Sequence, residues 1–209
     1  MKNYKVFDIS MDVQEDMITY EKIIDYLPKY QYRSFLEDTI RETEIKTNVH
    51  CGTHMDAPRH MIKQGDTIEK IDLHSAVCWC KVFDLTSCTD VITKEELSKF
   101  NIQKGDFIIL KTKSSFDTEY DFNFPYVDRD AAKYLVEKEI IGLGFDAMSI
   151  EREQADFSTH RTLMEKGINI LEGLRLAEIE EGEYFLSAAP IKLKGADGAF
   201  VRAVLVQFE

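Results

Sequence analysis

The sequence predicts an α/β protein in which helices and strands alternate around a mixed β-sheet. Strand-like apolar runs such as 105–112 and 140–145 are separated by segments with apolar residues at helical spacing, such as 129–139. The composition, with 44% hydrophobic and 31% charged residues, is typical of a soluble globular protein. A chain of 209 residues is long enough to bury a hydrophobic core, so we expect residues 1–209 to form one domain.

The N-terminal part is expected to begin with a strand at 4–10 and then to become irregular. Segment 11–41 looks helical in parts, but Pro28 and the clustered tyrosines around it indicate an irregular excursion. Segment 76–86 is a run of apolar residues that predicts the next strand of the sheet.

Two helices are marked by residues that cap helix N-termini. Thr93 and Glu96 have the spacing of a capping box, which predicts a short helix within 93–100. Asp128 precedes an amphipathic stretch, and its carboxylate can accept hydrogen bonds from the first backbone amides of a helix at 129–139.

The C-terminal part continues the alternation of helices and strands. Segment 159–167 predicts a short helix that ends at Gly167, and 168–174 predicts the strand that follows it. Segment 184–208 is expected to form two strands around the Gly-Ala-Asp-Gly turn at 195–198.

Charge and cysteine content exclude several classes of partner. The net charge is −12 and no run of lysines or arginines offers a phosphate-binding surface, so we expect neither nucleic acid nor an anionic membrane as a partner. The sequence shows no signal peptide and no transmembrane stretch. Four cysteines do not make a disulfide framework in a chain of this length, and a reducing cytoplasm fits this content.

The segment HCGTHMDAPRH, residues 50–60, holds three of the five histidines of the chain and an aspartate. In an extended strand His50, His54 and Asp56 would point to the same side, with Gly52 leaving room between them. Two imidazoles and a carboxylate suit Zn²⁺, Mn²⁺ or Fe²⁺. We therefore predict a metal site here, with His60 brought close to it by the turn that follows the proline.

Further ligands have to come from distant parts of the chain, because no fourth strong ligand for a closed zinc site follows nearby. His160 opens the helical segment 159–167. Glu172 interrupts an apolar strand, where a carboxylate is costly to bury unless it is paired or bound to a metal. His160 and Glu172 are therefore candidates for the further metal ligands.

The segment at 50–60 matches the H-x-G-T-H-x-D-x-P-x-H signature of the cyclase family, which contains bacterial kynurenine formamidases and isatin hydrolases. The stretch HRTLMEKGINILEGL resembles the distal His and Glu segment of that family, and FDIS, GFDAMSIE and AAPIKLKGADGAFVRAVL are similar to it as well. The resemblance therefore covers nearly the whole chain. It implies a β/β/α fold around a mixed sheet, a swivelling-domain-like arrangement, assembled as a homodimer or homotetramer.

The resemblance also implies a site with two divalent metal ions. His50, His54 and Asp56 would hold one ion, and Asp56 and Glu172 would bridge to a second ion that His160 also binds. Carboxylates suit bridging because each has two oxygens. The expected ions are Zn²⁺ first and Mn²⁺ second, since histidine and carboxylate donors accept both. His60 would be the catalytic proton donor and acceptor.

The implied function is hydrolysis of a small-molecule amide by a metal-activated water, as in the cleavage of N-formylkynurenine to kynurenine and formate in tryptophan catabolism. Kynurenine formamidases carry a Pro-aromatic-Pro-Gly-Asp-like stretch near the N-terminus, whereas this chain reads MITYEKII. Tyr20 lies nearest the aromatic position and is the candidate substrate-binding residue, with plain packing as its other reading. Hydrolysis of another cyclic amide or lactone, such as isatin, is the alternative reaction. A metal-dependent binding protein without turnover is the alternative class.

Overall fold

The computed structural model describes residues 3–20, 26–37, 39–152 and 154–208. Its centre is a nine-stranded mixed sheet with the strand order β1-β13-β11-β5-β7-β9-β10-β4-β12. The strands of this sheet are β1 (Tyr4–Asp8), β4 (His54–Asp56), β5 (Val77–Asp84), β7 (Phe107–Lys111), β9 (Gly142–Phe145), β10 (Asn169–Glu172), β11 (Gly182–Ser187), β12 (Gly198–Phe200) and β13 (Val204–Phe208).

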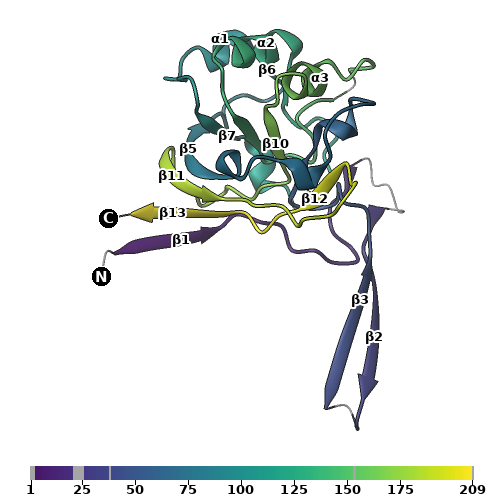
Figure 1. The fold of residues 1–209 in the computed structure, drawn as a ribbon. Coiled ribbons are helices and arrows are strands. Elements are labelled where there is room, and N and C mark those ends of the chain that lie inside the picture. Colours follow the sequence, from purple (N-terminus) through teal and green to yellow (C-terminus); the bar gives the residue numbers. More distant parts are fainter. Residues whose placement is uncertain (1–2, 21–25, 38, 153, 209) are drawn as a thin grey trace.

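Two short pairs of strands lie outside the large sheet. β2 (Lys29–Phe35) and β3 (Ile40–Lys46) form a hairpin, and β6 (Val91–Ile92) pairs with β8 (Tyr126–Val127). The described α-helices are α1 (Lys94–Leu97), α2 (Arg129–Glu137) and α3 (Ser158–Met164), and Figure 1 shows all three on one side of the molecule. Single 3₁₀ turns are η3 (Pro58–His60), η4 (Ile68–Lys70), η5 (Leu73–Ser75) and η6 (Lys113–Phe116).

The middle of the sheet is parallel, and its two ends are antiparallel. β5, β7, β9 and β10 run parallel to one another, while β11 pairs antiparallel with β5 and β4 pairs antiparallel with β10. Every residue of β7, β9 and β10 is buried, as expected of parallel strands that are covered on both faces. The mixed α/β fold predicted from the sequence is confirmed.

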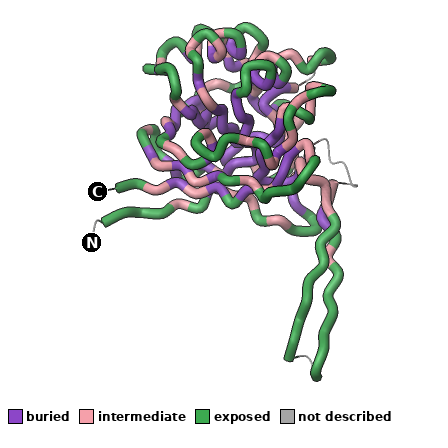
Figure 2. Tube along the Cα trace, viewed as in Figure 1, coloured by how far each residue is buried: buried purple, intermediate pink, exposed green. Residues whose placement is uncertain are grey.

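Two clusters of buried side chains cover the two faces of these central strands. One includes Leu110, Leu143 and Ile170 and packs against helices α2 and α3, and the other includes Ile109, Leu171 and Met55. Figure 2 shows the buried residues concentrated in this part of the molecule. The candidate site described below includes residues of β4 and β10, which pair with each other in the sheet.

The predicted helix caps are confirmed. The Thr93 hydroxyl oxygen accepts a hydrogen bond from the amide of Glu96 at the start of α1, and the Asp128 carboxylate accepts one from the amide of Ala131 in α2. After α3 the chain turns at Gly167 with φ of +70°, a conformation that glycine adopts without steric cost.

Two predictions about local structure need correction. Where segment 11–41 was expected to be partly helical, residues 29–46 contain the β2–β3 hairpin, in which polar residues alternate with Tyr30 and Tyr32. The part of that expectation that falls on 21–25 lies outside the described residues. Segment 184–208 contains β12 besides the two expected strands, because Gly198 to Phe200 pair with β4 at the opposite edge of the sheet.

Among the described residues, no helix is long and apolar enough to span a bilayer.

Candidate metal centre

The register between β4 and β10 places three of the predicted site residues side by side. His54 and Asp56 are two residues apart in β4, so they share one face, while Met55 between them points into the core and is fully buried. Glu172 lies directly opposite His54 in the antiparallel pairing. Its Oε2 atom is 3.4 Å from His54 Nε2, and Asp56 Oδ1 is also 3.4 Å from that nitrogen.

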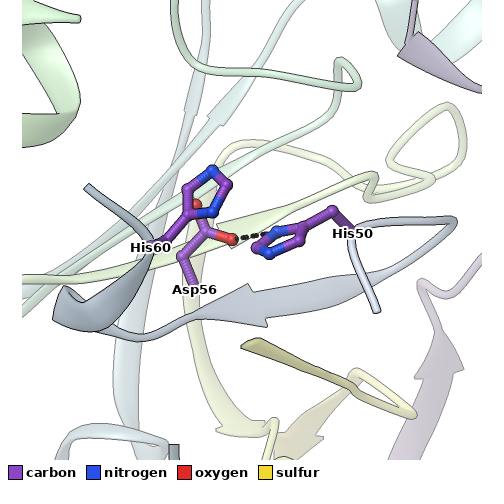
Figure 3. A group of neighbouring side chains, drawn as sticks. All are labelled: His50, Asp56 and His60. Atoms are coloured by element: carbon purple, nitrogen blue, oxygen red, sulfur yellow. Dashed lines mark hydrogen bonds and ion pairs between the residues drawn. The ribbon is translucent and has the colours of Figure 1, made fainter. Parts of the chain in front are cut away.

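His50 and His60 reach the same place from turns on either side of β4. The expectation of an extended chain from His50 onward is wrong for residues 50–53, which form a turn and a bend with Gly52 at a φ of +70°. The side chains nevertheless converge, as Figure 3 shows for His50, Asp56 and His60. His50 Nδ1 is 2.9 Å from Asp56 Oδ1. The centroids of the His50 and His60 rings are 3.9 Å apart.

The close approach of His50 depends on a glycine of a neighbouring strand. A Cβ atom on Gly198 in β12 would lie 2.9 Å from the His50 ring. Any other residue at this position would therefore push the imidazole away from Asp56.

His160 completes the group from helix α3. Its Nε2 atom lies 3.6 Å from Asp56 Oδ2 and 3.3 Å from Glu172 Oε1. Its Nδ1–H group donates a hydrogen bond of 2.6 Å to Glu151 Oε1, and the amide of Thr159 donates to the other oxygen of Glu151. Glu151 therefore fixes the direction of the ring and leaves Nε2 facing the two carboxylates.

His54 is oriented in the same way by the backbone. Its Nδ1–H group donates a 2.8 Å hydrogen bond to the carbonyl oxygen of Gly52, so Nε2 is the nitrogen that faces Asp56 and Glu172. Gly173 allows the loop to lie this close, because a Cβ at residue 173 would be 2.4 Å from the Gly52 carbonyl oxygen.

The group contains two buried carboxylates, Asp56 and Glu172, whose negative charge favours positive charge nearby. Burial by itself would lower the pKa of His54, but the negative charges of Asp56 and Glu172, each 3.4 Å from Nε2, outweigh it and raise the pKa to about 10. Burial likewise opposes protonation of His160, and the same two carboxylates with Glu151 raise its pKa well above the ordinary value. A cation bound between the carboxylates would neutralise their buried negative charge in the same way as protonated histidines.

The pKa of His60 shifts in the opposite direction. Burial lowers it, and the attraction of Asp56 does not make up for this loss of hydration. His60 is also the most exposed of the site imidazoles, with 27% of its side chain accessible. It therefore lies at the wall of the site and not in its interior.

The donor atoms fit divalent metal ions. Two of them, His54 Nε2 and Asp56 Oδ2, are buried without a hydrogen-bond partner among the described residues. Such atoms are rare in folded proteins unless an ion or water is bound to them. Ligand atoms of His54, Asp56 and Glu172 lie within 4.8 Å of one another, and so do those of His50, Asp56 and His60. Nitrogen and oxygen donors in this combination suit Zn²⁺ and Mn²⁺.

Two residues of the site were not recognised in the sequence. Asp197 Oδ2 lies 3.2 Å from His50 Nε2 and 3.6 Å from His60 Nδ1, and its backbone carbonyl accepts a hydrogen bond from the amide of Ala57. Asp197 belongs to the Gly-Ala-Asp-Gly segment, which was interpreted only as a turn. Glu151 ends GFDAMSIE, and its isolated carboxylate after an apolar stretch was the available signal.

A cavity of about 450 Å³ opens onto the site histidines. Apart from them it is lined largely by aromatic and sulfur-containing side chains, namely Tyr20, Tyr26, Phe122, Phe157, Met61 and Met148. Its volume is in the range of small-molecule sites. Tyr20 lines this cavity, and it also packs edge-on against Tyr120 and Phe124, so the structure is compatible with both interpretations of this residue.

Comparison with known proteins identifies the family. Residues 7–152 match the family model described as "Putative cyclase". The chain belongs to the cyclase family. The kynurenine formamidase of Bacillus thuringiensis (strain Al Hakam) is 29% identical over 207 residues, which are 98% of this chain and 99% of that protein.

Solved structures of cyclase-family proteins share the fold. A protein described as a potential metal-dependent hydrolase with cyclase activity has a TM-score of 0.92 at 43% identity, over 99% of this chain and 100% of that one. An isatin hydrolase bound to the product analogue thioisatinate has a TM-score of 0.86 at 19% identity, over 99% and 93% of the two chains. As a member of this family, the protein is an enzyme of the hydrolase class.

Proposed function

We propose that the protein is a metal-dependent hydrolase that cleaves an amide bond of a small aromatic molecule, in the manner of a kynurenine formamidase. The observation that carries this proposal is the pair of buried, unpartnered atoms His54 Nε2 and Asp56 Oδ2, beside an aromatic cavity that His54 lines. The kynurenine formamidase that matches along nearly the whole chain supports the amide as substrate.

The two oxygens of Asp56 face different sets of ligands, which favours two ions. Oδ1 lies near the His50 and His54 nitrogens, whereas Oδ2 lies near His160 Nε2. The two oxygens of Glu172 also face different histidines: Oε2 lies near His54 and Oε1 lies near His160. His50, His54 and Asp56 would hold one ion, and Asp56 and Glu172 would both be shared with a second ion that His160 would also hold. Zn²⁺ is the first choice and Mn²⁺ the second.

When bound, divalent ions polarise a substrate carbonyl and make water more acidic. The surrounding side chains have to exclude bulk water, hold the substrate ring and move a proton. In amide hydrolysis the oxygen of water joins the carbonyl carbon, the carbon–nitrogen bond breaks, and the leaving nitrogen takes up a proton. His60 lines the cavity, and a partly exposed imidazole there can accept the proton of water and deliver it to that nitrogen.

Two carboxylates hold the imidazoles in place for this chemistry. Asp197 Oδ2 is within hydrogen-bonding distance of His50 Nε2 and lies 3.6 Å from His60 Nδ1, where its negative charge favours a proton on Nδ1 and leaves Nε2 to accept the proton. Glu151 orients His160. Tyr20 contributes an aromatic edge to the cavity wall and is the candidate contact for the substrate ring.

Hydrolysis of a cyclic amide or a lactone is the second candidate reaction. It is favoured by MITYEKII at residues 17–24, which replaces the Pro-Gly-Asp-containing stretch expected of a kynurenine formamidase. A metal-dependent binding protein without turnover is the remaining alternative. The presence of His60 at the site argues against a binding protein, because metal binding alone does not require a proton shuttle.

The test is turnover by the purified protein after removal of metals and reconstitution with zinc or manganese. N-formylkynurenine, isatin and an aryl lactone are offered separately, and metal content is measured in parallel. Metal-dependent release of formate from N-formylkynurenine supports the proposal, while opening of isatin or the lactone alone supports the second candidate. Two bound ions without turnover of any substrate would leave the binding protein as the better description.

Some expectations from the sequence stay predictions. We expect the chain to act in the cytoplasm as one domain per subunit, and to assemble as a homodimer or homotetramer.

A further inference from the structure

Apart from the site residues and two tyrosines, the described lining of the cavity contains two polar side chains, Ser149 and Gln154. Ser149 has a hydrogen-bond partner, since its hydroxyl oxygen accepts from the amide of Glu151. Gln154 is only half satisfied. Its side-chain nitrogen donates a hydrogen bond, whereas its Oε1 atom is buried without a partner in the described part of the chain. A buried amide oxygen without a partner is rare in folded proteins, so a ligand is the natural source of the missing donor.

The orientation of the Gln154 amide follows from the hydroxyl group of Thr159. That hydroxyl has one proton, which it donates to the carbonyl oxygen of Val127 at 2.7 Å. Toward Gln154, 3.1 Å away, the hydroxyl can therefore only accept, so the Nε2 atom of Gln154 has to lie on that side. A reversed amide would bring two acceptors together. Oε1 is thus the end of the amide that is left for a ligand.

Thr159 also connects Gln154 to the metal centre. It immediately precedes His160, and its amide donates to one oxygen of Glu151 while His160 Nδ1 donates to the other. Gln154 is therefore held, through Thr159, in a defined position relative to a predicted metal ligand. An acceptor positioned in this way can select which substrates bind in a productive orientation.

The turn that carries Gln154 also presents an aromatic ring to the cavity. The amide of Phe157 donates to the carbonyl oxygen of Gln154, and Phe157 has a φ of +49°. This left-handed conformation is costly for a residue with a side chain, and such residues cluster at functional sites. Phe157 lines the cavity and is 47% exposed. Ala155 and Asp156 are exposed as well, so little packing opposes adjustment of the turn when a ligand enters.

We propose that Gln154 Oε1 accepts a hydrogen bond from an N–H group of the substrate, and that Phe157 contacts the substrate ring from the same turn. A lone acceptor is satisfied by a donor, and the nitrogen of a secondary amide, a lactam or an arylamine supplies one. An ester or lactone has an oxygen at the same position and would leave Oε1 unpaired. The cavity therefore selects amides against esters and lactones of the same shape. The assignment rests on the proposed hydrolase function and adds to it the class of bond that is cleaved.

The first experiment measures binding of two ligands that cannot be hydrolysed. Indole and benzofuran have the same shape, but indole presents an N–H group where benzofuran presents an oxygen. Their dissociation constants are measured by ligand-observed NMR titration with the full-length, zinc-loaded protein. The native protein should bind indole about 5- to 150-fold more tightly, the cost of leaving a buried acceptor unpaired. Gln154→Met keeps the length of the side chain without the amide oxygen and should bind the two ligands about equally.

Ser149→Ala is the matched control for Gln154→Met. It removes the other polar side chain from the same cavity wall and leaves Gln154 in place. It should keep the native preference for indole. Metal content and melting temperature establish that each variant is folded and holds its ions.

The second experiment makes the same comparison in turnover, with formanilide and phenyl formate as the amide and the ester. The two differ in reactivity, so the measured quantity is the change that a variant makes in the ratio of their kcat/KM values. Gln154→Met should lower the amide-to-ester ratio by about 5- to 150-fold, and Ser149→Ala should leave the ratio as it is. A purely structural role of Gln154 would lower both kcat/KM values alike.

Equal binding of indole and benzofuran by the native protein overturns the proposal, and so does the absence of detectable binding of either. A preference for indole that persists in Gln154→Met, or an amide-to-ester ratio that this variant does not change, overturns it as well. The proposed function fails separately. A protein that prefers indole through Gln154 but hydrolyses neither formanilide nor phenyl formate would have the N–H acceptor in a binding site without turnover.

Discussion

Replacing Glu172 by glutamine tests whether the buried carboxylates hold metal. Glutamine has nearly the same shape and keeps an oxygen that can accept the 2.8 Å hydrogen bond from the amide of Ile150. It removes the negative charge that lies 3.4 Å from His54 and 3.3 Å from His160. We therefore expect a folded variant that loses at least one ion per chain.

The magnitude follows from the coupling between binding and stability. A metal at 1,000 times its dissociation constant stabilises the fold by about 4.1 kcal/mol. In a chain of this size that corresponds to a rise of about 8–16 °C in melting temperature. Even changes to residues behind metal ligands weaken binding by about 10–100-fold. With a 100-fold weaker site the stabilisation falls to about 1.4 kcal/mol, or roughly 3–6 °C.

The assay compares melting temperature with and without zinc for the native protein, Glu172→Gln and a control. Glu183→Gln is the matched control, since Glu183 is an exposed glutamate on β11. Metal content is measured by mass spectrometry on the same samples. Each shift is taken within one variant, so any change in the stability of the metal-free fold cancels. Two bound ions and an undiminished shift in Glu172→Gln would refute the bridging role.

Three further outcomes are expected. His60→Ala should keep its metal content but lose about 10²–10⁴-fold in turnover, and unchanged turnover would remove His60 from the proton path. Glu151→Gln should weaken metal binding by about 10–100-fold, measured by competition with a chelator, because His160 loses a charged hydrogen-bond partner; equal affinity would contradict a positioning role. Metal-free protein should lose stability as the pH rises from 6.5 toward 10. The folded-state pKa of His54 is raised to about 10, so the stabilisation from its protonated form is complete below pH 6.5 and is lost as the pH rises toward 10. Thermal melts across this range check the last prediction, and stability that rises with pH would show that His54 is not held protonated.

Several parts of this protein were predictable because they depend on neighbours in sequence. The caps at Thr93 and Asp128 use hydrogen bonds to amides three residues away, so a local pattern predicts them correctly. The same is true of the apolar strands at the centre of the sheet, whose burial follows from composition. The family signature at 50–60 also identified the metal-site candidates without knowledge of the fold.

The predicted geometry of that signature was only partly correct. His54 and Asp56 share a face of β4 as an extended chain requires, but His50 approaches Asp56 through a turn at Gly52. The hairpin at 29–46 was missed for a related reason. Its alternation of tyrosines with polar residues is a strand signal, but Pro28 and the irregular flanks outweighed it.

The sequence by itself determined the chemistry available at the site: imidazoles and carboxylates that favour divalent metals, in a chain without a basic surface. Only the tertiary structure decided how these groups meet. Glu172 faces His54 because β10 pairs antiparallel with β4 in one register, and Asp197 and Glu151 support the imidazoles from segments far away in sequence. Such contacts depend on packing of the whole chain, which no short stretch of sequence encodes. The exposed apolar side chains of the β2–β3 hairpin are likewise visible only once the fold shows what is left uncovered.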